Sequence, residues 1–190
     1  MPLFAMTGIT GHVGGAAAQR LLAQGASVRA VVRTDAGASA WRDKGAEAAV
    51  ASLDDAQALT RAFDGADGVY VMTPTWFESP DMFAENVRAV KALGQALRAT
   101  RLRRIVLLSS VGAQHAARTG AILKLHHMEQ AFDDLAGVVS LRAGWFMENY
   151  ASLIPHARYR RAAEHAGAAR PCSSDGGDTG YRSRRRGSPA

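Results

Sequence analysis

Thr7-Gly8-Ile9-Thr10-Gly11-His12-Val13-Gly14 follows directly on the apolar run Pro2–Met6 and decides the fold. Its three glycines are spaced by two residues each, a pattern typical of the turn between a strand and a helix that binds a pyrophosphate. Gly8 would permit the sharp turn, Gly11 would let the backbone approach the phosphates, and Gly14 would let the helix pack closely on the strand. The stretch predicts a dinucleotide-binding turn; the alternative is a tight turn without a ligand.

Short β-rich runs alternate with longer helical patterns from this turn to residue 142. This alternation predicts an α/β fold, a Rossmann-like doubly wound parallel sheet with helices on both faces. Asp54 is expected to cap the third helix, and Ser79-Pro80-Asp81 to begin the fourth. We expect strands at residues 3–7, 27–32, 48–51, 68–72, 104–109 and 138–142, and helices at residues 14–24, 38–44, 56–63, 81–99 and 123–134.

The composition changes after Pro155, because residues 156–190 contain no Val, Ile, Leu, Met, Phe or Trp. This segment has eight arginines, no lysine and three acids, and it carries most of the net charge of +6. A segment without large apolar residues cannot bury enough surface to offset the entropy of ordering. We therefore predict an NAD(P)-binding domain over residues 1–155 and an Arg-rich, disordered tail over residues 156–190.

The charge and composition also bear on partners and location. Residues 1–155 are near neutral and have no basic stripe, so no nucleic-acid partner is expected. No apolar run reaches the roughly 18 residues that cross a bilayer, so no membrane association is expected either. The single cysteine, Cys172, excludes an internal disulfide and favours a cytoplasmic location. The histidines and the cysteine have no metal-ligand spacing, and the sequence indicates no oligomeric state.

Arg33 ends the second expected strand, about 20 residues beyond the glycines. An acid at this place would bind the adenosine ribose and select NAD, whereas an arginine would bind a 2′-phosphate and select NADP. The sequence therefore favours NADP(H) over NAD(H). Asp35 leaves the alternative open, because its carboxylate could still reach a ribose.

Five segments carry further motifs: Thr7–Gly14, Val31-Val32-Arg33, Met72-Thr73-Pro74, Ile105–Ala113 (IVLLSSVGA) and Leu141–Asn149 (LRAGWFMEN). Together they resemble the NmrA-like branch of atypical short-chain dehydrogenases, which includes bacterial NADPH:quinone oxidoreductases. The Trp-Phe-Met-Glu-Asn run is the most specific of them. The resemblance covers about residues 1–155.

The resemblance implies a role for several residues. The family commonly has Gly-Asp after the third strand, with the aspartate facing adenine, whereas this chain has Ala51-Ser52, and Ser52 can still form a hydrogen bond. By resemblance, Thr10, Gly11, His12 and Val13 touch the phosphates, Arg33 meets the 2′-phosphate, Thr73 and Pro74 line the cofactor groove, residues 109–111 (Ser109, Ser110 and Val111) lie near the nicotinamide, and Phe146 and Asn149 lie near the substrate.

The region between Ser109 and Arg142 has no tyrosine, so the Tyr-x-x-x-Lys pair of carbonyl-reducing short-chain dehydrogenases is absent. One expected helix instead carries Lys124, His126, His127 and Glu129. Lys124 and His126 are the candidate catalytic residues, and a solvated helical face is the alternative explanation.

Reduced quinone oxygens take up protons readily, so the missing tyrosine is compatible with quinone reduction. These features predict hydride transfer from NADPH to a quinone or a similar small flat acceptor. The alternative is a non-catalytic, NAD(P)H-sensing regulator that acts through protein partners.

The tail also suggests that the chain is a family member truncated by a frameshift after about residue 155. Asp175–Arg184 can be encoded so that a one-base shift reads Met-Val-Ala-Thr-Pro-Asp-Ile-Gly-Arg, which resembles the family's return from the substrate lobe. The C-terminal substrate lobe is accordingly expected to be missing or incomplete, and turnover to be poor.

Overall fold

Six strands form one parallel sheet in the order β3-β2-β1-β4-β5-β6. The computed structural model describes residues 1–154. Its first unit, Met1–Trp145, contains the whole sheet, and the segment from Phe146 is a second unit, described here by itself. The strands are β1 (Leu3–Met6), β2 (Ser27–Val32), β3 (Glu47–Val50), β4 (Gly68–Val71), β5 (Ile105–Ser110) and β6 (Val138–Ala143).

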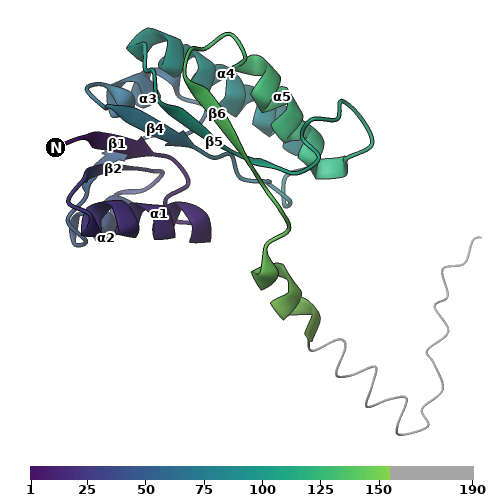
Figure 1. Cartoon of the computed structure of the whole chain (residues 1–190), viewed down its shortest axis with the longest axis horizontal. Helices are drawn as coiled ribbons and strands as arrows, with labels where there is room; N and C mark the ends of the chain where they lie inside the picture. The colour runs from purple at the N-terminus through teal and green to yellow at the C-terminus, as the bar shows by residue number, and fades with distance from the viewer. Residues whose placement is uncertain (155–190) are drawn as a thin grey trace, which may run out of the picture. The chain divides into compact units, whose positions relative to one another are not determined.

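The helices cover both faces of the sheet, as predicted (Figure 1). α1 (His12–Ala23) and α2 (Asp35–Arg42) lie on one face. α3 (Ala56–Phe63), α4 (Met82–Thr100) and α5 (Leu123–Ala131) lie on the other. Two short 3-10 helices follow, η1 (Gly120–Ile122) before α5 and η2 (Met147–Leu153) in the second unit. The predicted tail, residues 156–190, lies outside the described residues.

Each face of the sheet has its own apolar core. The larger core includes Phe63 of α3, Leu93 of α4 and Phe132 after α5, all fully buried against β1, β4 and β5. The smaller core packs Trp41 of α2 and Ala18 of α1 against the first strands. The two central strands, β1 and β4, are covered on both faces, and their sequences are accordingly nearly continuous apolar runs. Within residues 1–154, no helix combines the length and apolarity that a membrane span needs.

Side-chain caps set where three helices begin. Thr34 Oγ1 accepts from the Gly37 amide at 3.2 Å, so α2 begins at Asp35, three residues before the expected start. Asp55 Oδ1 accepts from the Ala58 amide at 2.9 Å. The prediction that Asp54 caps α3 is therefore wrong by one residue. Asp81 caps α4 through the Ala84 amide at 2.9 Å, at the expected helix start.

The strand order reverses between β1 and β4, which pair in register from Phe4 with Gly68 to Met6 with Tyr70. In doubly wound sheets, ligands bind in the crevice outside the carboxyl ends of the strands at this reversal. The glycine turn after β1 and the loop after β4 both begin at this edge.

Candidate functional site

A groove lies at the carboxyl ends of β1 to β4, where the sheet order reverses. Its walls come from the turn after β1, the ends of β2 and β3, the loop after β4, and the first turns of α2 and α4. The lining residues are Gly8, Thr10, Val31, Val32, Arg33, Thr34, Gly37, Ala51, Ser52, Leu53, Asp54, Met72, Pro74, Trp76, Glu85 and Ala89.

The three glycines of the turn differ in how a side chain at their position would affect the fold. Gly8 has a φ of 61°, which side-chain-bearing residues rarely adopt. A Cβ on Gly14 would lie 2.5 Å from the Gly8 carbonyl oxygen, so α1 could not pack as closely on β1. A Cβ on Gly11 would have its nearest neighbour, the same oxygen, at 3.4 Å, and the backbone there is extended. The protein itself therefore needs Gly8 and Gly14, whereas a Cβ on Gly11 would make only ordinary van der Waals contacts.

The N-terminus of α1 is suited to an anion. Gly11 is its cap residue and provides no side-chain hydrogen bond, and the first turn contains no acidic residue. The first amides of a helix have no partner within the helix and carry a partial positive charge. His12 and Val13 are in this first turn, next to the groove residues Gly8 and Thr10. Such an uncapped helix end is a ready-made phosphate site.

Arg33 lies at the end of β2 and lines the groove beside Thr34 and Gly37. Its side chain is exposed, and no carboxylate of the described residues forms an ion pair with it. A free guanidinium presents a planar fork that matches a phosphate. Asp35 begins α2 and, unlike Arg33, is not among the described residues that line the groove.

The loop after β3 provides another wall of the groove, through Ala51, Ser52, Leu53 and Asp54. Ser52 is an exposed residue of this wall. Its hydroxyl can donate to or accept from a base, as expected from the sequence.

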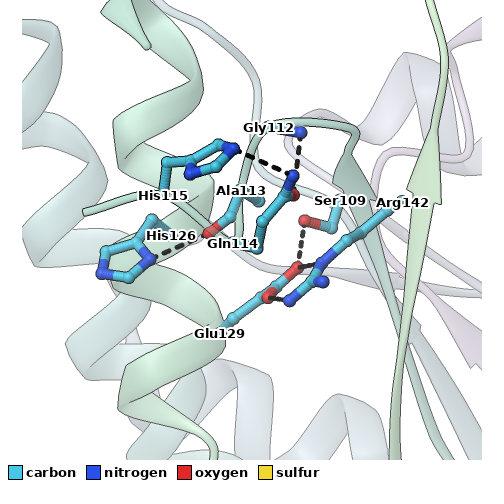
Figure 2. A network of polar contacts seen from close by, with 8 residues as sticks. All are labelled: Ser109, Gly112, Ala113, Gln114, His115, His126, Glu129 and Arg142. Atoms are coloured by element: carbon cyan, nitrogen blue, oxygen red, sulfur yellow. Dashed lines mark hydrogen bonds and ion pairs between the residues drawn. The ribbon is translucent and has the colours of Figure 1, made fainter. Parts of the chain in front are cut away.

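Several predicted site residues do not line the groove. Thr73 is buried directly after the lining residue Met72. Ser109 is also buried, and its hydroxyl donates to Glu129 Oε1 (Figure 2). Ser110 Oγ donates to the Val111 carbonyl at 3.1 Å. Neither serine lines the groove among the described residues.

Glu129 of α5 joins β5 to β6 through a polar network (Figure 2). Arg142 of β6 donates to both of its oxygens, from Nε to Oε1 at 3.1 Å and from Nη2 to Oε2 at 2.6 Å. The hydrogen bonds from Arg142, with a smaller contribution from Ser109, hold the pKa of Glu129 below its usual value although burial raises it. The glutamate is therefore ionised and bonded at neutral pH.

The two candidate catalytic residues on α5 make different contacts. His126 Nδ1 lies 2.8 Å from the Ala113 carbonyl oxygen (Figure 2). Lys124 is 3 % exposed, and its Nζ donates to the carbonyl oxygens of Thr73 at 3.3 Å and Pro74 at 2.7 Å. Neither residue lines the groove, but Lys124 bonds directly to the loop that does.

The predicted substrate residues belong to the second unit. Phe146 precedes η2, and its carbonyl accepts from the Asn149 amide at 3.1 Å. Their role in binding an acceptor stays a prediction. Within the described residues, no group of three or more His, Cys, Asp or Glu side chains could hold a metal ion.

Sequence reasoning missed Met72, Trp76 and Glu85 as groove residues. Met72 follows a strand that points to the sheet reversal, which is a usable signal. Trp76 and Glu85 come from an irregular loop and a helix that approach the groove only through tertiary packing.

The model of a protein family described as NAD(P)H-binding matches residues 8–138. The chain belongs to this family. The match includes the glycine turn, Arg33 and both candidate catalytic residues. Among curated proteins, sterol demethylase protein B of Methylococcus capsulatus is 31% identical over 112 residues, which are 57% of this chain and 34% of that protein.

Solved structures of NAD(P)H-dependent reductases share the fold of this NAD(P)H-binding chain. An NADPH-dependent quinone oxidoreductase of Escherichia coli, complexed with NADPH, has a TM-score of 0.71 and 23% identity, over 83% of this chain and 54% of that one. A Citrobacter triphenylmethane reductase, complexed with NADP(H), has a TM-score of 0.70 and 19% identity, over 83% of this chain and 55% of that one. The chain thus spans about half the length of these relatives.

Proposed function

We propose that this chain is an NmrA-like oxidoreductase that binds NADP(H) in the groove and transfers hydride from NADPH to a quinone or a similar small flat acceptor. The observation that carries the proposal is the groove itself. Gly8 and Thr10 of the glycine turn, which precede the uncapped end of α1, line it together with Arg33, which has no ion pair among the described residues, at the reversal of a parallel sheet. These are the groups that a dinucleotide with a 2′-phosphate requires.

The residues have distinct roles in this proposal. The turn that binds the pyrophosphate consists of Gly8, Thr10, Gly11, His12, Val13 and Gly14. Arg33 binds the 2′-phosphate and so favours NADP(H) over NAD(H), and Ser52 faces the adenine. The nicotinamide half comprises Thr73, Pro74, Ser109 and Ser110. The side chains of Thr73 and Ser109 are buried, so these two residues shape that half without lining the groove. Phe146 and Asn149 contact the acceptor.

The bound nicotinamide supplies the hydride, and the chain's own residues bind and orient the cofactor and the acceptor. A quinone that accepts a hydride and one proton becomes a hydroquinone, and NADPH becomes NADP⁺. Water can supply the proton to the reduced oxygen, so an acidic side chain is not essential. Lys124 and His126 stay the candidates if the protein does supply it.

The relatives support the class of reaction, because one reduces quinones and another reduces triphenylmethanes, and both bind NADPH or NADP(H). Their chains extend well beyond the matched part, so the acceptor and the turnover of this chain belong to the proposal.

Steady-state oxidation of NADPH with a panel of quinones tests the proposal. We expect the loss of NADPH absorbance to depend on the quinone and to be faster than with NADH. A chain that binds NADPH but turns over no quinone would instead favour the alternative, an NAD(P)H-sensing regulator that acts through protein partners.

A further inference from the structure

Lys124 places a charged group inside the protein without an acidic partner. Its side chain is 3 % exposed, although lysine is almost never fully buried unless it is paired. Among the described residues no carboxylate lies within ion-pair distance of Nζ. Its hydrogen bonds go to two main-chain carbonyls, those of Thr73 and Pro74. A buried ammonium is costly, so this placement calls for a role.

The backbone of Lys124 is held by a hydrogen bond from a neighbouring helix. Asn86 of α4, which is 1 % exposed, donates from Nδ2 to the Lys124 carbonyl at 3.1 Å. The backbone of Lys124 is thereby tied to α4 as well as to α5. The ammonium at the other end of the side chain also lies 5.8 Å from the ring centroid of Trp76. Lys124 therefore connects a rigid helix pair to the segment 73–76.

The segment 73–76 is a wall of the groove and has no regular structure to hold it. It lies between the end of β4 at Val71 and the start of α4 at Met82. Pro74 and Trp76 line the groove. Trp76 has a φ of 47°, a conformation that a bulky residue adopts only when its surroundings impose it. The Ser79 amide donates to the Trp76 carbonyl at 2.9 Å, and the Lys124 ammonium holds the chain just before it, at the carbonyls of Thr73 and Pro74.

From these contacts we propose that Lys124 is a positioning residue for cofactor binding: its ammonium holds the 73–76 wall of the groove in the conformation that receives the dinucleotide. This role rests on the proposed function, because it needs a dinucleotide in the groove. It differs from proton donation, since two of the three ammonium N–H groups are directed at the loop carbonyls.

The role predicts a pH dependence of binding. Burial lowers the pKa of Lys124 to about 8. The ammonium, and the full strength of its bonds to the loop, is present below this pKa and is lost as the pH rises through it. The acids of the two neighbouring helices are already paired, Glu85 with Arg88 and Glu129 with Arg142. Neither contributes to the shift of Lys124, and the other groups that face it, Asn86, Thr73 and Trp76, are uncharged in this range.

Titration of the full chain with NADPH between pH 7.5 and 9.5, followed by nucleotide fluorescence, tests the proposal; the 2′-phosphate is fully ionised at these pH values because its second pKa is about 6. We expect the Kd of the unmodified chain to rise about tenfold across the range, the loss expected for one charge-assisted hydrogen bond. In Lys124→Met the Kd at pH 7.5 should already be raised about tenfold and should not change with pH. Lys91→Met, the same change at an exposed lysine of α4, should follow the unmodified chain.

Three results would overturn the positioning role. One is a flat pH profile of the unmodified chain, which needs no variant to fold. Another is Lys124→Met binding NADPH like the unmodified chain. The third is a Lys124→Met variant that binds NADPH with an unchanged Kd but no longer turns over a quinone, because this result would make Lys124 a proton donor. If the unmodified chain binds no NADPH at any pH, the proposed function itself is wrong.

Discussion

At the scale of single residues, substitutions of Gly11 and Gly14 distinguish an effect on ligand binding from an effect on folding. A methyl group on Gly11 meets nothing closer than 3.4 Å, whereas one on Gly14 meets the Gly8 carbonyl oxygen at 2.5 Å. Gly11→Ala should therefore fold normally and bind NADPH at least tenfold more weakly, roughly 1.4 kcal/mol, because its methyl group occupies space that the pyrophosphate needs. Gly14→Ala should lower the thermal unfolding temperature.

Circular dichroism and NADPH titration of the two variants check this prediction. Gly11→Val should abolish the binding of both NADPH and NADH. Normal binding by a folded Gly11→Ala or Gly11→Val would mean that the turn does not hold a phosphate.

Arg33 carries the prediction on cofactor choice. Its side chain is exposed in the groove and has no acidic partner among residues 1–154, so it is free to bind a 2′-phosphate. NADPH should bind more tightly than NADH, and Arg33→Ala should remove most of the difference, on the order of 1–3 kcal/mol for one charge-assisted contact. Competitive titration of both nucleotides measures it. Equal affinities in the unmodified chain would contradict the assignment.

At the scale of elements, the cap of α3 distinguishes two adjacent aspartates. Asp55 accepts from the Ala58 amide, whereas Asp54 is exposed and forms no cap. Asp55→Ala should reduce the free energy of unfolding by about 1 kcal/mol. Asp54→Ala is the matched control and should leave it nearly unchanged. Urea denaturation of both variants would refute the assignment if Asp54→Ala were the more destabilising.

The junction of β5, α5 and β6 predicts a pH dependence of stability. Arg142 holds the pKa of Glu129 below its unfolded value, so the ionised glutamate stabilises the fold above that value. This stabilisation is lost as the pH falls through the lowered pKa. Glu129→Gln should thus be less stable than the unmodified chain at about pH 6, with the gap narrowing towards about pH 3. Denaturant unfolding at both pH values measures the gap, and a constant gap would count against the ion pair.

At the scale of the whole molecule, the sequence predicted every strand and α-helix of the first unit but not the short 3-10 helix η1. Other errors lie at the ends of elements, where a single capping hydrogen bond determines the residue at which a helix begins. Thr34 and Asp55 accept such bonds. In the site, the glycine turn, Arg33, Ser52 and Pro74 come together around one groove. Ser109 does not join them, because it lies on the same face of β5 as Ile105 and Leu107, towards α5.

The partners of the buried polar groups could not be predicted in this way. That Lys124 binds the loop after β4, and Glu129 the strand β6, depends on how helices pack against distant segments. No local pattern encodes that packing. The expected tail and the expected truncation fall on residues 156–190, outside the described part of the chain, and stay predictions.

We propose that this chain holds NADPH in the groove between the glycine turn, Arg33 and the 73–76 loop. Calorimetric titration of the unmodified chain with NADPH tests it most directly. We predict saturable binding with one site per chain, weakened by Gly11→Ala and by Arg33→Ala. An absence of saturable binding by the folded chain, or binding that neither substitution alters, would contradict the claim.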